Sequence, residues 1–294
     1  MGLNVTAHTV QQYGTNVALL LQQKGSKLRD TVTIGSHVGK AAVPVEQIGA
    51  INAKVRAGRG APVVFTDSPE TRRWVYPTDY DTDAEIVDSA DKLRMLIDPQ
   101  SSYVTNAVYA LGRKMDDVII AAATATSNIG KTGSSTEAFD TATYQVTGSI
   151  GGTNSGLNVA KLRRAKRMLE EAFVDLEQEQ PTLVISAKQH DDLLNEIQVV
   201  SSDFNPQPVL VDGMVTRFMG FNIKRSQRLT FSTTRRVLAY VKSGIHLGMW
   251  NDIKTDVSER ADLVGKPTQV YAMGTFGATR IEQGKVIEIL CYES

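Results

Sequence analysis

The chain has 294 residues, 41% of them hydrophobic and 22% charged, a composition typical of a water-soluble globular protein with one or two domains. Its 32 basic and 32 acidic side chains give a formal net charge of zero, which argues against a protein whose main task is to bind nucleic acid through a basic surface. The single cysteine, Cys291, excludes an intrachain disulfide framework and fits a reducing cytoplasm. The sequence has neither a signal-peptide pattern nor a run of about 18 uncharged apolar residues, so we expect no membrane span.

The N-terminal part of the chain has few large apolar side chains. Residues 1–30 are predicted to form a polar arm with a weakly amphipathic helical turn around Val17–Leu21. Residues 31–90 indicate an extended segment in which short β-rich runs, Val63–Phe65 and Arg72–Tyr76, are separated by Gly, Pro and Ser-Pro. This segment buries too little apolar surface to offset its own chain entropy, so we expect it to lie against a neighbouring subunit. The side chains expected at that contact are Lys54, Arg56, Arg59, Arg72, Arg73, Trp74, Asp79, Asp81 and Asp83.

Residues 98–128 are predicted to form one uninterrupted helix. Asp98 can cap its start, and Pro99 fits the first helical position, where a missing N–H costs nothing. At about 1.5 Å per residue the helix would be about 40 Å long. Such a rod beside a segment without a core suggests a shell subunit rather than a compact enzyme. One face of the helix carries the apolar residues Val104, Val108, Leu111, Met115, Val118, Ile119 and Ala122.

A low-complexity connector then leads into a compact α/β region. Asn158 is predicted to cap a helix whose apolar face continues to Phe173 and Leu176. A buried strand, Thr182–Ile185, follows, and Ser186 opens a second helix with a capping box. Turns are expected at Met219-Gly220 and Gln283-Gly284. Further strands are predicted at Met214–Phe218, Phe221–Ile223, Val237–Val241, Ile253–Val257, Thr268–Met273, Thr275–Ile281 and Val286–Leu290.

The stretch from Ala125 to Thr132 approaches the phosphate-loop pattern GxxxxGK[ST]. Its first position is Ala125 rather than Gly, and it follows a predicted helix, whereas the loop requires a preceding strand. Gly130 is therefore interpreted as a helix stop. A nucleotide-binding enzyme built around Gly130-Lys131-Thr132 stays the remote alternative.

Asp79, Asp81 and Asp83 resemble the start of a calcium loop. Ala84 stands where the sharp turn needs Gly, and Ala90 where the bidentate Glu belongs. The alternating aspartates are therefore placed on the solvated face of a strand.

The remaining motifs give no site either. The four histidines show no metal-ligand spacing, and residues 148–156 lack the preceding strand and the acidic residue of a dinucleotide fingerprint. The Arg72-Arg73-Trp74 cluster lies between acidic residues, which favours a subunit contact over nucleic acid. Cys291 lies in an apolar terminal strand and is expected to be a buried thiol. We predict no catalytic, metal-binding or cofactor-binding residues.

Three groups of segments share their order with a known family. They are Asp91–Leu93 through Asp98-Pro99 and Ala110–Ile120 at the junction of the extended segment with the long helix, Pro181–Leu194 and Gly213–Ser226 in the α/β region, and Ile253–Glu259 and Thr268–Glu282 in the late strands. In the order of these parts, the chain resembles the major capsid protein of tailed bacteriophages, which has the Hong Kong 97-type coat fold. The resemblance spans nearly the whole chain, and its motifs are specific only together.

The resemblance implies an α+β fold with named parts. The apolar positions Val104, Val108, Leu111, Met115, Val118 and Ile119 would form the core face of the spine helix. The parts are an N-terminal arm (1–30), an extended loop (31–90), a peripheral domain with the spine helix (91–133), a connector and axial domain (134–250), peripheral-domain return strands (251–284) and a C-terminal strand (285–294).

The resemblance also implies a function without a cofactor: self-assembly as hexamers and pentamers into an icosahedral virion shell around double-stranded DNA, in the cytoplasm of a bacterial host. Implied partners are a separate scaffolding protein, a portal protein and, in some relatives, a decoration protein. Contact with DNA would be weak and non-specific, through Lys24, Lys27 and Arg29 of an inner-surface arm. Some relatives carry a Lys–Asn crosslink, but neither Lys40 nor Lys54 of the loop is matched to that motif, so no crosslink residues are assigned. A nanocompartment shell protein of the same fold, similar to encapsulins, is the nearer alternative.

Overall fold

The computed structural model describes residues 21–43, 46–55, 58–59, 70–87, 100–150, 153–196 and 215–293. Contacts within the chain divide it into two compact units, and each unit is assembled from three separate stretches. The smaller unit comprises Met1–Ser26, Asp79–Arg113 and Asn251–Gly274, and the larger comprises Lys27–Thr78, Lys114–Trp250 and Thr275–Ser294.

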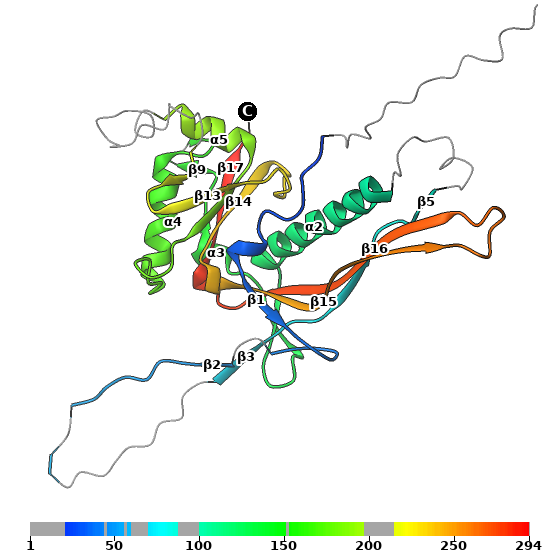
Figure 1. Cartoon of the computed structure of the whole chain (residues 1–294). Helices are drawn as coiled ribbons and strands as arrows, with labels where there is room; N and C mark the ends of the chain where they lie inside the picture. The colour runs from blue at the N-terminus through cyan, green and yellow to red at the C-terminus, as the bar shows by residue number, and fades with distance from the viewer. Residues whose placement is uncertain are drawn as a thin grey trace, which may run out of the picture. The chain divides into compact units, whose positions relative to one another are not determined.

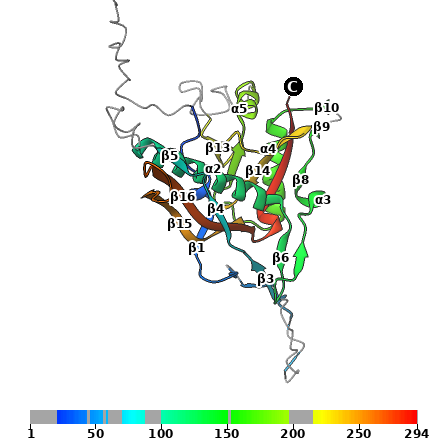
Figure 2. The ribbon, with the colours of Figure 1, turned by 90° about the vertical axis from the view of Figure 1, so that its right-hand side faces the viewer.

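The larger unit is built on a mixed sheet. Within the described residues it has six strands in the order β12-β13-β11-β14-β17-β8. β11 is parallel to β13 and antiparallel to β14, and its four residues are all buried. The C-terminal strand β17, red in Figure 2, lies between β14 and β8, so the end of the chain completes the core of this unit. The strands are β8 (Gln145–Val146), β11 (Thr182–Ile185), β12 (Arg217–Phe218), β13 (Phe221–Arg225), β14 (Thr234–Tyr240) and β17 (Val286–Tyr292).

Two helices of the larger unit begin at the predicted caps. The side chain of Asn158 accepts a hydrogen bond from the backbone of Lys161 at 2.9 Å and opens α4 (Val159–Glu171). Ser186 opens α5 (Ala187–Leu194) in a capping box, with its backbone N–H donating to Gln189 Oε1 at 3.0 Å. The predicted continuation of the α4 face to Phe173 is wrong. The helix ends at Glu171, and Phe173 takes a left-handed φ of 59° with its side chain 96% exposed.

The long helix is α2 (Gln100–Thr124), which is shorter than predicted. The proposed cap, Asp98-Pro99, lies outside the described residues. The helix stops before residue 128 because Ser127–Ile129 forms the strand β6, which pairs with β7 (Ser135–Glu137). Of the apolar face, Leu111, Met115, Ile119 and Ala122 are buried, whereas Val104, Val108 and Val118 are half-buried.

The described end of the N-terminal arm crosses α2. A Cβ on Gly112 would lie 2.7 Å from the backbone nitrogen of Ser26, so only glycine admits this approach. One turn further, the buried carboxylate of Asp116 accepts hydrogen bonds from the backbone N–H groups of Lys27 and Leu28. The arm then enters a short 3-10 helix, Arg29–Thr31.

A second sheet contains two long strands, β15 (Ile245–Glu259) and β16 (Thr268–Arg280), drawn as long arrows in Figure 1. Each is longer than predicted, and β16 unites two predicted strands. Among the described residues, β1 lies parallel to β15, and β4 and β5 pair with β16. These shorter strands are β1 (Thr33–Ser36), β4 (Thr78–Asp81) and β5 (Glu85–Val87).

A small sheet has the strand order β2-β3-β6-β7 in the described chain, with β2 (Glu46–Ile48) beside β3 (Glu70–Trp74). β3 takes the place of the predicted run Arg72–Tyr76, and the predicted run Val63–Phe65 lies outside the described residues. We expected residues 31–90 to lie against a neighbouring subunit, but β1, β3, β4 and β5 pair with strands of their own subunit. Minor elements are α3 (Thr141–Tyr144), the pair β9 (Ser149–Ile150) and β10 (Thr153–Asn154), and the 3-10 turns Lys242–Gly244 and Gln283–Lys285.

Candidate functional site

The base of the extended segment, by which we mean Ala42 and Arg73–Val75, is fixed within the larger unit by hydrogen bonds and an ion pair. Trp74 Nε1 donates to the carbonyl oxygen of Gly130 at 2.7 Å. The buried guanidinium of Arg73 forms an ion pair with Glu137 of β7. Val75 and Ala42 exchange two backbone hydrogen bonds of 3.0 Å. Sequence analysis placed Arg73 and Trp74 at a contact with a neighbour, but the structure uses both side chains inside the subunit.

A buried arginine lies beside this base. Arg280, at the end of β16, is 1% exposed and donates through Nη1 to the carbonyl oxygens of Ala123 and Ala125. Its guanidinium lies over the ring of Phe139, 5.1 Å from the centroid. Burial, followed by the nearby charge of Arg73, lowers the pKa of Arg280 to about 10. Sequence reasoning missed this residue, because no local pattern links position 280 to the end of α2.

From the last residue of β2 onward, the described part of the extended segment is open to solvent and carries apolar side chains. Ile48, Ile51 and Val55 are 71%, 69% and 97% exposed. β2 and β3 lie side by side where this segment leaves the sheet (Figure 1). Exposed apolar side chains that are clustered along one segment mark an interaction site, whereas single ones are ordinary. The segment is the strongest candidate for a contact surface.

The charged residues predicted for this contact are not gathered into one site. Lys54 and Arg59 are exposed, and Arg56 lies outside the described residues. Arg72 forms an ion pair of 2.7 Å with Glu46 of the neighbouring strand. Asp79 and Asp81 are exposed on β4, and Asp83 is exposed just after it.

The three basic residues predicted to contact DNA from the arm differ in their exposure and in their contacts within the subunit. Lys24 is exposed, but Lys27 Nζ donates to the carbonyl oxygen of Arg225 at 3.1 Å. Arg29 is half-buried in the 3-10 turn.

The turn between β15 and β16 exposes a second apolar spot. Val264 is fully exposed and Leu263 is 40% exposed. Gly265 and Lys266 both have left-handed φ values, 85° and 46°, which allow the tight reversal. This turn is a further candidate for contact with another subunit.

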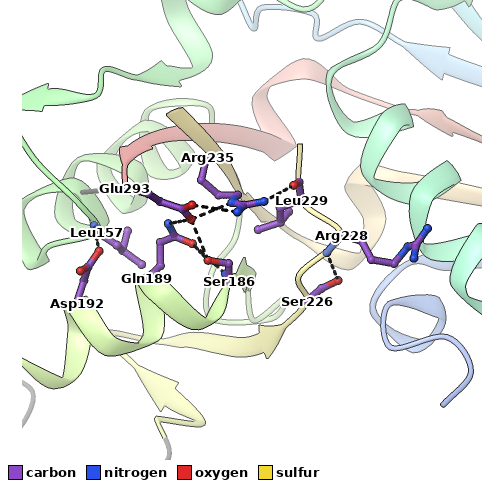
Figure 3. A network of polar contacts seen from close by, with 9 residues as sticks. All are labelled: Leu157, Ser186, Gln189, Asp192, Ser226, Arg228, Leu229, Arg235 and Glu293. Carbon is purple, nitrogen blue, oxygen red and sulfur yellow. Dashed lines mark hydrogen bonds and ion pairs between the residues drawn. The ribbon is translucent and has the colours of Figure 1, made fainter. Parts of the chain in front are cut away.

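A polar network holds the C-terminus on the larger unit (Figure 3). Both carboxylate oxygens of Glu293 accept hydrogen bonds from Arg235, at 2.9 and 3.0 Å. Gln189 and Ser186 of the α5 capping box donate to the same carboxylate. The hydrogen bond from Arg235 is the main reason that the pKa of Glu293 falls to about 2. The network connects β17 to the start of α5.

The structure also brings together two histidines for which the sequence showed no common motif. The Nε2 atoms of His37 and His246 lie 2.8 Å from each other, and Trp250 stacks obliquely on His37. A Cβ on Gly35 would lie 2.7 Å from His246, and one on Gly248 would lie 2.9 Å from His37, so two glycines make room for the two rings. Burial, followed by the charge of His37, lowers the pKa of His246 to about 4.

The phosphate-loop resemblance finds no support in the geometry. Gly130 is not a helix stop, because α2 ends at Thr124 and Gly130 follows the strand β6 with a left-handed φ of 85°. The hydroxyl groups of Thr132 and Ser134 contact each other at 2.9 Å. No three His, Cys, Asp or Glu side chains gather as a metal site in the part of the chain that the structure describes. In that same part, no helix is long and apolar enough to span a membrane.

Projecting segments with exposed apolar side chains on an anchored base define a protein that acts through contacts between subunits. The sequence model described as "Phage capsid protein" matches residues 5–293. The chain therefore belongs to this phage capsid protein family, whose members form the shell of the virion.

Solved structures support the same fold. The capsid structure of the cyanophage P-SCSP1u has a TM-score of 0.75 at 15% identity, over 96% of this chain and 93% of that chain. The capsid of cyanophage Pam1 gives a TM-score of 0.74 at 13% identity, over 98% and 97% of the two chains. The capsid of Ralstonia phage GP4 gives 0.67 at 13% identity, over 100% and 98%. No curated protein matches the chain in sequence. The predicted α+β coat-protein fold is confirmed.

Proposed function

We propose that copies of this capsid protein form hexamers and pentamers, which close into an icosahedral shell around the double-stranded DNA of a tailed phage. The observation that carries the proposal is the extended segment, with its anchored base and its exposed Ile48, Ile51 and Val55. Burial of each side chain against a neighbouring subunit would contribute about 1.5–3 kcal/mol. Contacts of this size, repeated around a capsomer, suffice to select one mode of assembly.

The proposal assigns a structural role to each part of the chain. Residues 31–90 form the extended loop, of which the described exposed part, 46–55, lies across the neighbour. Residues 91–133 and 251–284 belong to the peripheral domain, with α2 as its spine. Residues 134–250 are the connector and axial domain, and 285–294 complete the sheet of that domain through β17.

The partners belong to the proposal as well. Besides its own copies, the subunit would meet a separate scaffolding protein, a portal protein and, where the phage has one, a decoration protein. Its contact with packaged DNA would be weak and non-specific, because the net charge is zero. The role is structural and not enzymatic.

Removal of the apolar side chains from the extended segment tests the proposal. We expect Ile51→Ser combined with Val55→Ser to leave the subunit folded, because both side chains are exposed, but to abolish shells in electron micrographs. Lys54→Gln is the matched control on the same segment and should form shells, because one exposed charge contributes little. Normal shells from the double variant would contradict the proposed role of the segment.

The contents of wild-type shells separate this proposal from the nearer alternative. Large, DNA-filled shells in infected cells support a phage coat, and small DNA-free cages would support a nanocompartment. A protein that stays monomeric or dimeric under all conditions would contradict both.

A further inference from the structure

The outer face of α4 carries four basic side chains within five residues. Arg163, Arg164 and Arg167 are exposed and Lys166 is half-buried, whereas Ala165 between them is buried. A hollow of about 680 Å³ opens over this face. We call it the α4 basic face. Its lining includes Arg163, Arg164, Lys166, Arg167, Glu170 and Met219.

The helix behind this face is rigidly placed. Its opposite side buries Leu162, Met168 and Leu169 in the larger unit. Lys161, which is fully buried, donates through Nζ to the carbonyl oxygens of Gly148, Ser155 and Leu290 at 2.6–2.9 Å. The basic side chains therefore project from a fixed backbone, and the loss of one of them need not disturb the fold.

The α4 basic face has a surplus of positive charge. Glu170 lines the hollow, and Glu171 forms an ion pair of 3.2 Å with Arg167, so four cations face two carboxylates. Arg163 and Arg164 have no ion-pair partner among the residues that the structure describes. The rest of the chain must carry a matching negative surplus, because the whole is neutral.

We propose that the α4 basic face binds the phosphate backbone of duplex DNA. This inference rests on the proposed function, in which the shell encloses double-stranded DNA. The guanidinium fork of Arg163 or Arg164 can hold two phosphate oxygens at once. Because phosphates carry no sequence information, the contact is non-specific and depends steeply on salt.

The chemistry of the face favours DNA over an acidic protein partner. The centres of protein interfaces are depleted of charge, and this hollow offers Met219 as its one large apolar side chain within the described chain. Protein–DNA interfaces, in contrast, are polar and strongly positive. The assignment also differs from the sequence-based expectation for the arm, where the ammonium group of Lys27 donates a hydrogen bond to the carbonyl oxygen of Arg225.

The test compares full-length subunits in equilibrium binding to a labelled duplex of about 25 base pairs over a series of salt concentrations. Each phosphate contact makes the slope of log K against log salt more negative by about 0.9. R163Q/R164Q/R167Q should therefore reduce the size of this negative slope by about 2–3. The control K40Q/K242Q/K254Q removes the same charge from exposed lysines elsewhere and should leave the slope nearly unchanged. E170Q/E171Q removes the competing carboxylates and should tighten binding.

A measurement of shell assembly by the same variants separates a failure of the DNA-binding inference from a failure of the proposed shell function. Shells formed by R163Q/R164Q/R167Q, together with the reduced slope, support the inference. An unchanged slope in a variant that still forms shells would overturn the inference and leave the proposed function intact. An equal reduction of the salt slope in the lysine control would also overturn the inference, because net charge alone would then explain DNA binding. A folded triple variant that binds DNA normally but forms no shells would assign the face to a protein contact instead.

Discussion

Arg280 Nη1 donates a hydrogen bond of 3.0 Å to the carbonyl oxygen of Ala123, in the last turn of α2. A second bond of 2.8 Å reaches Ala125, just beyond the helix. The last carbonyl groups of a helix lack partners within it, and they carry partial negative charge. A buried guanidinium from a strand that is far away in sequence therefore satisfies and stabilises the end of the longest helix.

We expect Arg280→Ala to lower the free energy of unfolding by about 2–5 kcal/mol, through lost hydrogen bonds and a buried cavity. Denaturant unfolding followed by circular dichroism measures the change. Arg260→Ala is the control, because Arg260 is only half-buried and its solvated pair with Asp262 should contribute little to stability. Equal effects of the two substitutions would mean that Arg280 does not support the helix end.

The middle of α2 gives a second stability prediction. Leu111 is 2% exposed, so Leu111→Ala should cost about 2–5 kcal/mol and leave the subunit insoluble or unable to assemble. Val104→Ala removes less side chain from a half-buried position of the same helix and should cost clearly less. Solubility, unfolding and electron microscopy measure the outcome. Normal assembly of the Leu111 variant would contradict the assigned core face.

Local signals in the sequence predicted much of the fold. Asn158 and Ser186 begin their helices as expected, and Thr182–Ile185 is a strand with the predicted bounds. These features depend on residues that are close in sequence. The Met219-Gly220 turn is of the same kind, with both residues at left-handed φ.

Long-range partners were not predictable in this way. The position of β17 between β14 and β8 follows from the pairing of segments far apart in the chain. The end of α2 follows from the pairing of β6 with β7, which competes with helix extension. His37 and His246 are separated by 209 positions, and no spacing rule connects them. The predicted contact residues Arg72 and Arg73 are polar enough for a surface, but their acidic partners lie on other strands of the same subunit.

The side-chain carboxylate of Glu293 predicts a loss of stability in acid. The pKa of Glu293 is lowered from 4.5 to about 2, chiefly by the hydrogen bond from Arg235. The folded state therefore favours the charged form, and this contribution is present above pH 4.5 and is lost as the pH falls toward 2. Glu293→Gln should flatten the pH dependence of thermal unfolding in that window. Glu177→Gln, at an exposed position, should leave it unchanged.

The histidine pair predicts a second loss of stability, in a higher range of pH. Only one of two facing Nε2 atoms can donate, so the contact of 2.8 Å between His37 and His246 requires at least one neutral ring. The pKa of His246 is lowered from 6.5 to about 4, mainly by burial and then by His37. The folded state therefore favours the neutral form, and its stabilisation is complete above pH 6.5 and is lost as the pH falls toward 4. Because β1 pairs with β15 beside these rings, the protection factors of the Thr33–Ser36 amides against hydrogen exchange should fall as the pH drops over that range. His246→Gln should remove this fall while His190→Gln keeps it, and protection factors that are independent of pH in the wild type would show that the pair does not control the edge of the sheet.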